Sequence, residues 1–137
     1  MSEAALPLPP DEFILRRIHR SHCDRQLPVS ILLAAFRPSK ADTTGLSVYR
    51  AKDVSPAEVA ATGRKPGEYY VVRLPVRALQ ALNLTVVADE QPDGPPGHAL
   101  IPELSLTAYE QTKEPLKAVL VELARLASEA IVHEPDT

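Results

Sequence analysis

The C-terminal segment carries the longest periodic pattern in the chain, and this pattern constrains the fold most. From Pro115 to Ile131, apolar residues recur at spacings of three and four, as they do along one side of an α-helix. The residues of this stripe are Leu116, Val119, Leu120, Leu123, Ala127, Ala130 and Ile131. An isolated helix cannot bury such a stripe, so it must pack on the rest of the chain or on a second copy. We favour packing on a sheet of the same chain.

The chain before this helix consists of short segments, most of which have strand character. Alternating apolar and polar residues, or runs of β-branched and aromatic residues, predict strands. The expected strands are 13–20, 46–50, 68–74, 84–88 and 98–101, and a short helix is expected over 75–82. The first strand has a short helix as its alternative, and the apolar run 31–36 fits either element by its length.

Local motifs predict where two further helices begin. Ser55-Pro-Ala-Glu58 is a capping box with proline at the first helical position, and Gly63 suits the C-terminal cap. These residues predict a helix of about two turns between them. A second capping box, Thr107-Ala-Tyr-Glu110, predicts a helix start there.

Together these elements predict the α+β class, with a mixed sheet of about five short strands, two short helices and the long C-terminal amphipathic helix. Apolar residues make up 45% of the 137 residues, which is enough for a core. We expect a flexible arm at 1–10, an α+β core at 11–104, and a helical segment at 105–137 that packs on the core or on a partner. Three prolines and two glycines predict an irregular loop at 89–97.

Charge is distributed unevenly along the chain. Residues 1–77 carry 12 basic and 8 acidic side chains, whereas residues 78–137 carry 3 basic and 10 acidic ones. The two halves can therefore attract each other, within one chain or across a dimer, or the first half can bind an anionic partner. The net charge of −3 disfavours nucleic-acid binding, because a basic excess supplies most of that affinity. We expect a protein partner or self-association rather than a nucleic acid.

Other features exclude whole classes of protein. The chain contains no run of about 18 apolar residues, so no membrane-spanning helix is predicted. The first ten residues do not resemble a secretory signal. The single cysteine, Cys23, excludes a disulfide framework, so a cytoplasmic location is expected. His19, His22 and Cys23 offer three potential metal ligands, but no second pair with suitable spacing exists. We therefore expect neither a metal site nor a cofactor.

The residues best suited to chemistry lie on the expected strands. Arg17 and His19 share one face of the first strand, Ser47 and Tyr49 share a face of another, and His98 opens the last one. If these strands are neighbours, one cleft would bind an anionic or nucleotide-like ligand and use a histidine for acid–base work. The candidates are Arg17, His19, Arg37, Tyr49 and His98 for ligand binding, and His19, Ser47, Tyr49 and His98 for catalysis. The alternative is that these side chains only decorate a solvated face.

Four short motifs resemble, in this order, a set of small bacterial proteins of unassigned function. They are Arg17-Ile-His19, Phe36-Arg-Pro, Gly45-Leu-Ser-Val48 and Gly97-His-Ala-Leu-Ile101. The resemblance covers roughly residues 13–102 and implies no particular activity. More faintly, the chain is similar to the ADP-ribosyltransferase fold, in which a histidine and a later tyrosine or serine hold the nicotinamide cofactor. That similarity implies His19 with Ser47 or Tyr49 in those places, while the catalytic glutamate of that fold has no clear counterpart here and Glu103 is the one candidate.

These observations favour a binding or accessory module that acts through contacts with another protein. The mixed charge, the loop 89–97 and the apolar terminal helix each suit a contact surface. The first alternative is a small nucleotide-binding or ADP-ribosyltransferase-like enzyme that uses the His, Ser and Tyr side chains named above. The second is a regulator that binds nucleic acid through Arg16, Arg17, Arg20 and Arg25.

Overall fold

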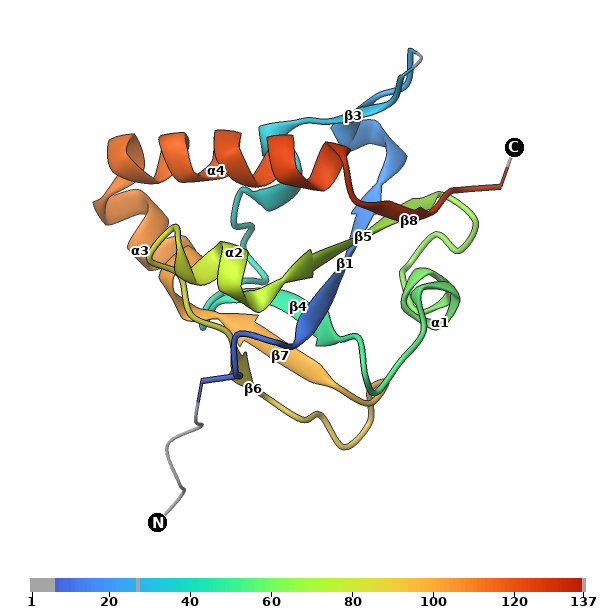
Figure 1. The fold of residues 1–137 in the computed structure, drawn as a ribbon, viewed down its shortest axis with the longest axis horizontal. Coiled ribbons are helices and arrows are strands. Elements are labelled where there is room, and N and C mark those ends of the chain that lie inside the picture. The colour runs from blue at the N-terminus through green and yellow to red at the C-terminus, as the bar shows by residue number, and fades with distance from the viewer. Residues whose placement is uncertain (1–6, 27, 137) are drawn as a thin grey trace.

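The computed structural model describes residues 7–26 and 28–136, and it has the α+β class that the sequence predicts (Figure 1). Its main element is a six-stranded sheet with the strand order β6-β7-β4-β1-β5-β8. The strands are β1 (Phe13–His19), β4 (Leu46–Arg50), β5 (Tyr69–Pro75), β6 (Val87–Ala88), β7 (His98–Ile101) and β8 (Ile131–His133). Each of these strands runs antiparallel to its neighbours in the sheet.

Helices and short turns connect and cover these strands. The α-helices in the described residues are α1 (Pro56–Ala61), α2 (Val76–Gln80), α3 (Leu106–Gln111) and α4 (Lys113–Ser128). Turns of 3-10 helix are η1 (Arg20–His22), η2 (Leu33–Phe36) and η3 (Pro102–Leu104). A separate two-stranded ribbon pairs β2 (Cys23–Asp24) with β3 (Ser30–Ile31), and β3 packs against α4.

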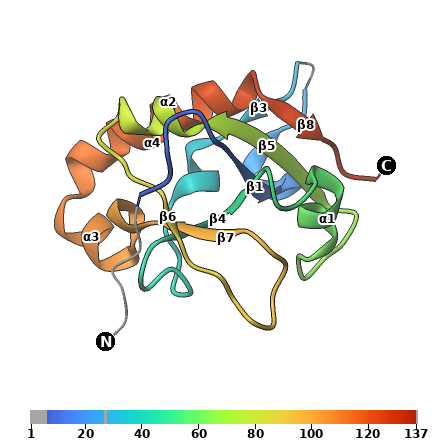
Figure 2. The same ribbon diagram turned by 60° about the horizontal axis from the view of Figure 1, so that its bottom comes forward.

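Helix α4 lies across one face of the sheet, which is visible in both views (Figures 1 and 2). Leu120, Leu123 and Ala127 are fully buried and share one apolar core with Ile14 of β1 and Val72 of β5. The stripe of the helix therefore packs on the sheet of its own chain, as we favoured. Docking on a second copy is not needed to remove this stripe from water.

The apolar stripe predicts a helix that continues to Ile131, but α4 ends before that residue. The helix ends at Ser128 with Glu129 as its cap, and Ile131 begins β8 instead. β8 pairs with the outer edge of β5, where the Arg73 amide donates to the Ala130 carbonyl over 3.0 Å. The edge of β5 needs hydrogen-bond partners, and this tertiary demand outweighs the helical spacing of the last two apolar residues.

Three other segments differ from expectation or refine it. The unassigned run 31–36 divides between the end of β3 and the turn η2, and of the expected strand 84–88 only Val87 and Ala88 pair. Residues 1–6 of the expected arm lie outside the described residues. Leu8, in contrast, is buried, and its amide donates to the Val86 carbonyl over 2.7 Å, so packing extends to residues before 11.

One of the two predicted capping boxes forms. The Ser55 hydroxyl accepts from the Glu58 amide over 3.1 Å, while the Glu58 carboxylate accepts from the Ser55 amide over 3.0 Å. The box at Thr107 is wrong, because the cap of α3 is Ser105, whose hydroxyl accepts from the Ala108 amide over 3.1 Å. The preceding turn η3 ends at Leu104, so the helix begins before Thr107 is reached.

The second face of the sheet is covered partly by α1. The strand registers place His98, Tyr49, Leu15 and Arg73 in one row across β7, β4, β1 and β5 on this face. A smaller apolar cluster, which includes Val59 of α1 together with Leu15 and Tyr49, forms beneath the helix. This face carries five of the sequence candidates and the cleft described next; the five are Arg17, His19, Ser47, Tyr49 and His98.

Candidate functional site

The structure brings Ser47, Tyr49 and His98 into contact and places Arg17 beside them. His98 Nε2 lies 3.1 Å from Ser47 Oγ, and the His98 and Tyr49 rings meet edge to face with centroids 5.4 Å apart. The guanidinium carbon of Arg17 lies 6.0 Å from the centroid of the Tyr49 ring. These residues come from β1, β4 and β7, which are neighbours in the sheet as the expected cleft requires.

Arg17 acts mainly as an anchor for α1. Its Nη1 donates to the Val59 carbonyl over 3.2 Å and to Thr62 Oγ1 over 2.7 Å, at the C-terminal end of the helix. Its guanidinium carbon also lies 5.4 Å from the ring centroid of Tyr69, which is buried along with Tyr49. A cation is favourable at a helix C-terminus and over aromatic rings, so these contacts hold α1 on the sheet.

Hydrogen bonds determine which nitrogen of His98 carries the proton. Nδ1 lies 2.9 Å from the Asp89 carbonyl oxygen and 3.1 Å from Asp89 Oδ2. A carbonyl oxygen can only accept, so Nδ1–H is the donor. In the neutral ring Nε2 then carries the lone pair and accepts the Ser47 hydroxyl proton. The three side chains form one chain of hydrogen bonds, Ser47 to His98 to Asp89.

His19 belongs to a separate group at the other side of Tyr69. Its Nδ1 accepts from the Ser21 amide over 3.2 Å and lies 2.8 Å from the Ser21 hydroxyl, while Nε2 donates to Glu68 Oε1 over 2.8 Å. Accepting from the amide makes His19 the N-terminal cap of the turn η1. The stacked side chains of Arg17 and Tyr69 stand between His19 and His98, so the two histidines do not share one cleft.

Two further candidates lie outside both groups. Arg37 is exposed and follows η2. Glu103 accepts from the Thr85 amide over 2.9 Å and from the Thr85 hydroxyl over 2.7 Å. It lines a cavity of about 350 Å³ between the 82–84 segment, α3 and α4, which none of the other candidates lines. Glu103 therefore does not lie beside His19 or Tyr49, contrary to what the ADP-ribosyltransferase similarity implies, and the glutamate that contacts His19 is Glu68.

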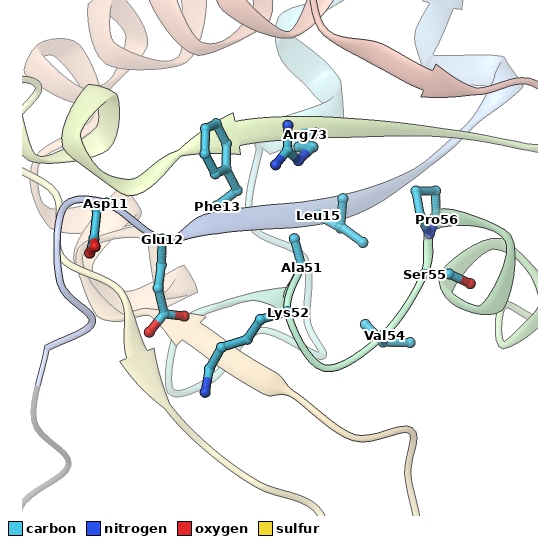
Figure 3. A pocket seen from close by; sticks show the side chains of 10 residues that line it. All are labelled: Asp11, Glu12, Phe13, Leu15, Ala51, Lys52, Val54, Ser55, Pro56 and Arg73. Atoms are coloured by element: carbon cyan, nitrogen blue, oxygen red, sulfur yellow. The ribbon is translucent and has the colours of Figure 1, made fainter.

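A cleft of about 480 Å³ opens on the same face of the sheet, beside α1 (Figure 3). Its apolar lining comes from Phe13, Leu15, Ala51, Val54 and Pro56, and its polar lining from Asp11, Glu12, Lys52, Ser55 and Arg73. Arg73 lies over the Phe13 ring, with its guanidinium carbon 3.8 Å from the ring centroid. Among the described residues, no carboxylate lies within ion-pair distance of Arg73.

Sequence reasoning missed both this cleft and Asp89. The cleft joins residues from β1, the 51–56 segment and β5, and only the strand register shows that Phe13 and Arg73 meet. The sequence predicts that Asp89 begins an irregular loop. An antiparallel pairing of 84–88 with 98–101 would have placed it beside His98, because the Asp89 amide continues the ladder by donating to the His98 carbonyl over 2.9 Å.

The carboxylate of Glu12 in this cleft is already neutralised. Arg50 Nε donates to Oε1 over 2.9 Å, and Arg50 Nη2 donates to Oε2 over 2.5 Å. The Glu12 side chain is 15% exposed and the Arg50 side chain is 19% exposed. Hydrogen bonding from Arg50 holds the pKa of Glu12 below its ordinary value and raises the pKa of Arg50.

Replacing Glu12 by glutamine is expected to lower the free energy of unfolding by about 2 kcal/mol at pH 7, because a charge-assisted bidentate pair is lost. The folded-state pKa of Glu12 is lowered, so the pair stabilises the protein above the unfolded value of 4.5. That contribution disappears as the pH falls through the lowered pKa. Urea unfolding of both proteins between pH 7 and pH 3 should show the difference shrinking at acidic pH. A difference independent of pH would contradict this account.

Two further observations concern potential metal ligands and the Cys23 thiol. Over residues 7–26 and 28–136, no three His, Cys, Asp or Glu side chains are grouped so that they could hold a metal ion. Burial raises the pKa of Cys23 to about 11, which keeps the thiol protonated and weakly nucleophilic at neutral pH.

No helix of the described residues is long and apolar enough to cross a membrane. Comparisons with protein-family models, curated proteins and solved structures give no match to this chain.

Proposed function

We propose that this chain is a binding module whose cleft, shown in Figure 3, holds an acidic and apolar segment of a partner protein. The observation that carries the proposal is the position of Arg73. Its guanidinium lies on the Phe13 ring at the wall of an apolar cleft, without a carboxylate partner among the described residues. A guanidinium stacked in this way keeps its in-plane N–H donors available for an incoming carboxylate.

The lining of the cleft supports a ligand with two parts. An aliphatic or aromatic group would cover Phe13, Ala51 and Pro56, the partly exposed apolar residues of the lining, which removes apolar surface from water. A carboxylate attached to that group would reach Arg73, which lies at the upper side of the cleft, away from Glu12 (Figure 3). The volume of about 480 Å³ is within the range of binding pockets and suits one or two side chains of a partner.

The other surfaces suggested by the sequence support binding less well. The apolar stripe of α4 is buried on the sheet, and only Val121 stands out on that helix at 54% exposure. Of the four clustered arginines, Arg17 is used by α1. Arg16 donates three hydrogen bonds to the carbonyl oxygens of Ala35 and Ser47. Two of the four are therefore engaged inside the fold, which weakens the nucleic-acid alternative.

Phenylacetate is a simple probe for this cleft, because it carries a carboxylate on an aromatic body. In an NMR titration of the ¹⁵N-labelled full chain, phenylacetate should shift the amide signals of the cleft residues in a saturable way. The uncharged analogue phenylacetamide should bind more weakly. Arg73→Gln should weaken phenylacetate binding about tenfold, because a charge-assisted hydrogen bond is lost.

Arg37→Gln is the matched control, since Arg37 is an exposed arginine that does not line the cleft. This variant should bind phenylacetate like the wild type. Equal binding by Arg73→Gln and the wild type would refute the assigned role of Arg73. Shifts confined to residues outside the cleft would refute the site itself.

A further inference from the structure

We propose that Ser47 is a nucleophile, activated by His98 and Asp89, and that it accepts acyl groups from carboxylic esters. This activity goes beyond ligand binding in the cleft and rests on different atoms. Three bonded side chains carry it: Ser47 Oγ lies 3.1 Å from His98 Nε2, and His98 Nδ1 lies 3.1 Å from Asp89 Oδ2. A hydroxyl, a base and a carboxylate that orients the base are the parts of a serine nucleophile.

The proton arrangement of His98 is the one that such a reaction requires. The main-chain carbonyl of Asp89 can only accept, so the proton on Nδ1 is fixed by a group that cannot titrate. Nε2 then faces Ser47 with its lone pair, ready to take the hydroxyl proton. The carboxylate of Asp89 adds a negative charge that would stabilise the imidazolium formed during the reaction.

Several contacts hold these groups in place before any ligand binds. The ring of Tyr49 packs edge to face on His98, and the Arg50 amide donates to the Gly97 carbonyl over 2.7 Å. Gly97 has φ +85°, and a Cβ there would come within 3.3 Å of the Arg50 backbone. The loop 89–97 is therefore clamped at both ends against β4 and β7, which keeps Asp89 on His98.

Arg16 holds the backbone of β4 at Ser47 from the other face of the sheet. Its Nη1 donates to the Ser47 carbonyl over 2.7 Å, and its guanidinium carbon lies 5.7 Å from the centroid of the Phe36 ring, which belongs to the core beneath α4. Arg16 alternates with Leu15 and Arg17 along β1, so it positions the strand and does not contact Ser47 Oγ. Ser47 itself is only partly buried and His98 is 13% exposed, which leaves the pair open to a small ester.

The reaction proceeds in two balanced steps. Ser47 Oγ attacks the ester carbonyl carbon and its proton passes to His98 Nε2; the carbon–alkoxide bond then breaks, and the alcohol leaves with that proton. Ser47 Oγ now carries the acyl group as an ester. In the second step water attacks the same carbon, gives its proton to Nε2, and the carboxylic acid departs as Ser47 recovers its hydrogen.

The second serine–histidine–carboxylate group provides an internal comparison. Ser21 and Glu68 flank His19 at 2.8 Å each, but the lone pair of Nδ1 is shared with the Ser21 amide, which donates to it over 3.2 Å. The serine lies two residues from the histidine, in a local turn that this bond caps. We therefore expect Ser47, and not Ser21, to be reactive.

A fluorophosphonate probe tests this assignment without knowledge of the natural ester. When it reacts, an Oγ–P bond forms, the P–F bond breaks, and fluoride leaves while the hydroxyl proton passes through His98 to solvent. Mass spectrometry of the digested full chain should locate the adduct on the peptide that contains Ser47. His98→Gln should slow labelling about a hundredfold, because it removes the general base. Asp89→Asn should also slow it, and His19→Gln should leave the rate unchanged.

Circular dichroism and the thermal midpoint show whether each variant is folded, and Asp89→Asn, a nearly isosteric change of a half-buried side chain, replaces His98→Gln if the latter unfolds. Absence of an adduct on Ser47 in the wild type would overturn the proposal. So would an adduct on Ser21 instead, or a labelling rate at Ser47 that is the same in folded His98→Gln or Asp89→Asn as in the wild type.

Discussion

Leu123→Ala is expected to lower the free energy of unfolding by about 3 kcal/mol. Leu123 is fully buried in the core between α4 and the sheet, and alanine would leave a cavity that the neighbouring side chains cannot close. Urea unfolding followed by circular dichroism measures the change. The size of the effect reports directly on whether the apolar stripe of the helix packs inside one chain.

Val121→Ala is the matched control on the same helix. Val121 is 54% exposed and points away from the core, so its truncation should change the free energy of unfolding by less than about 0.5 kcal/mol. Similar effects of the two substitutions would show that the stripe is not buried as described. A midpoint for Leu123→Ala that rises strongly with protein concentration would point instead to burial against a second copy.

Gly63→Ala is expected to be nearly as damaging, with a loss of about 2–3 kcal/mol. Gly63 lies just after α1, and a Cβ at this position would come within 2.1 Å of Tyr69 Cε2. The Tyr69 ring is buried and stacks with Arg17, and its hydroxyl accepts from the Lys65 amide over 3.2 Å. It therefore cannot move aside without breaking the contacts that hold α1 on the sheet.

Gly94→Ala is the control for Gly63→Ala, because a Cβ at Gly94 meets only Gln91 Cβ at 3.3 Å in the exposed loop. We expect it to be nearly neutral. A smaller side chain at position 69 should leave room for the added methyl group. Tyr69→Leu combined with Gly63→Ala should therefore lower the free energy of unfolding by less than the sum of the two single changes. Simple additivity would show that the Tyr69 ring is not what excludes the methyl group.

Gly63 shows how a correct local prediction can rest on the wrong reason. The sequence suggested a helix C-terminal cap, and α1 does end there, at Ala61 with Thr62 as its cap. Gly63 is not among the residues with positive φ, however, so conformational freedom is not why glycine fits. The close approach of the Tyr69 ring explains it. That ring lies on another element, and only the folded chain shows the contact.

Elements determined by short-range rules were predictable. The capping box at Ser55, the alternating strand β4 and the strand β7 before Pro102 follow from residues within a few positions. Elements determined by tertiary pairing were not. β8 forms because the edge of β5 accepts it, and η2 forms where β3 has finished pairing with β2. No local spacing distinguishes these outcomes from a longer helix or a longer strand.

The same distinction between local and tertiary determinants holds for the candidate site. Ser47, Tyr49 and His98 meet because alternation on adjacent strands places them on one face, which the sequence indicated. His19 shares that face, but lies beyond the Arg17 and Tyr69 stack. The contact between Phe13 and Arg73 depends on the register of β1 against β5, and one residue of slippage would place Arg73 on the opposite face.

The most direct test of the binding account is an isotope-edited NOE experiment on the labelled full chain with phenylacetate. We expect cross-peaks from the ring protons of the ligand to the Phe13 ring and to the methyl groups of Leu15 and Val54, which line the cleft. Cross-peaks to Leu82 and Leu116 instead, in the second cavity, would contradict it, as would an absence of any cross-peak under saturating conditions.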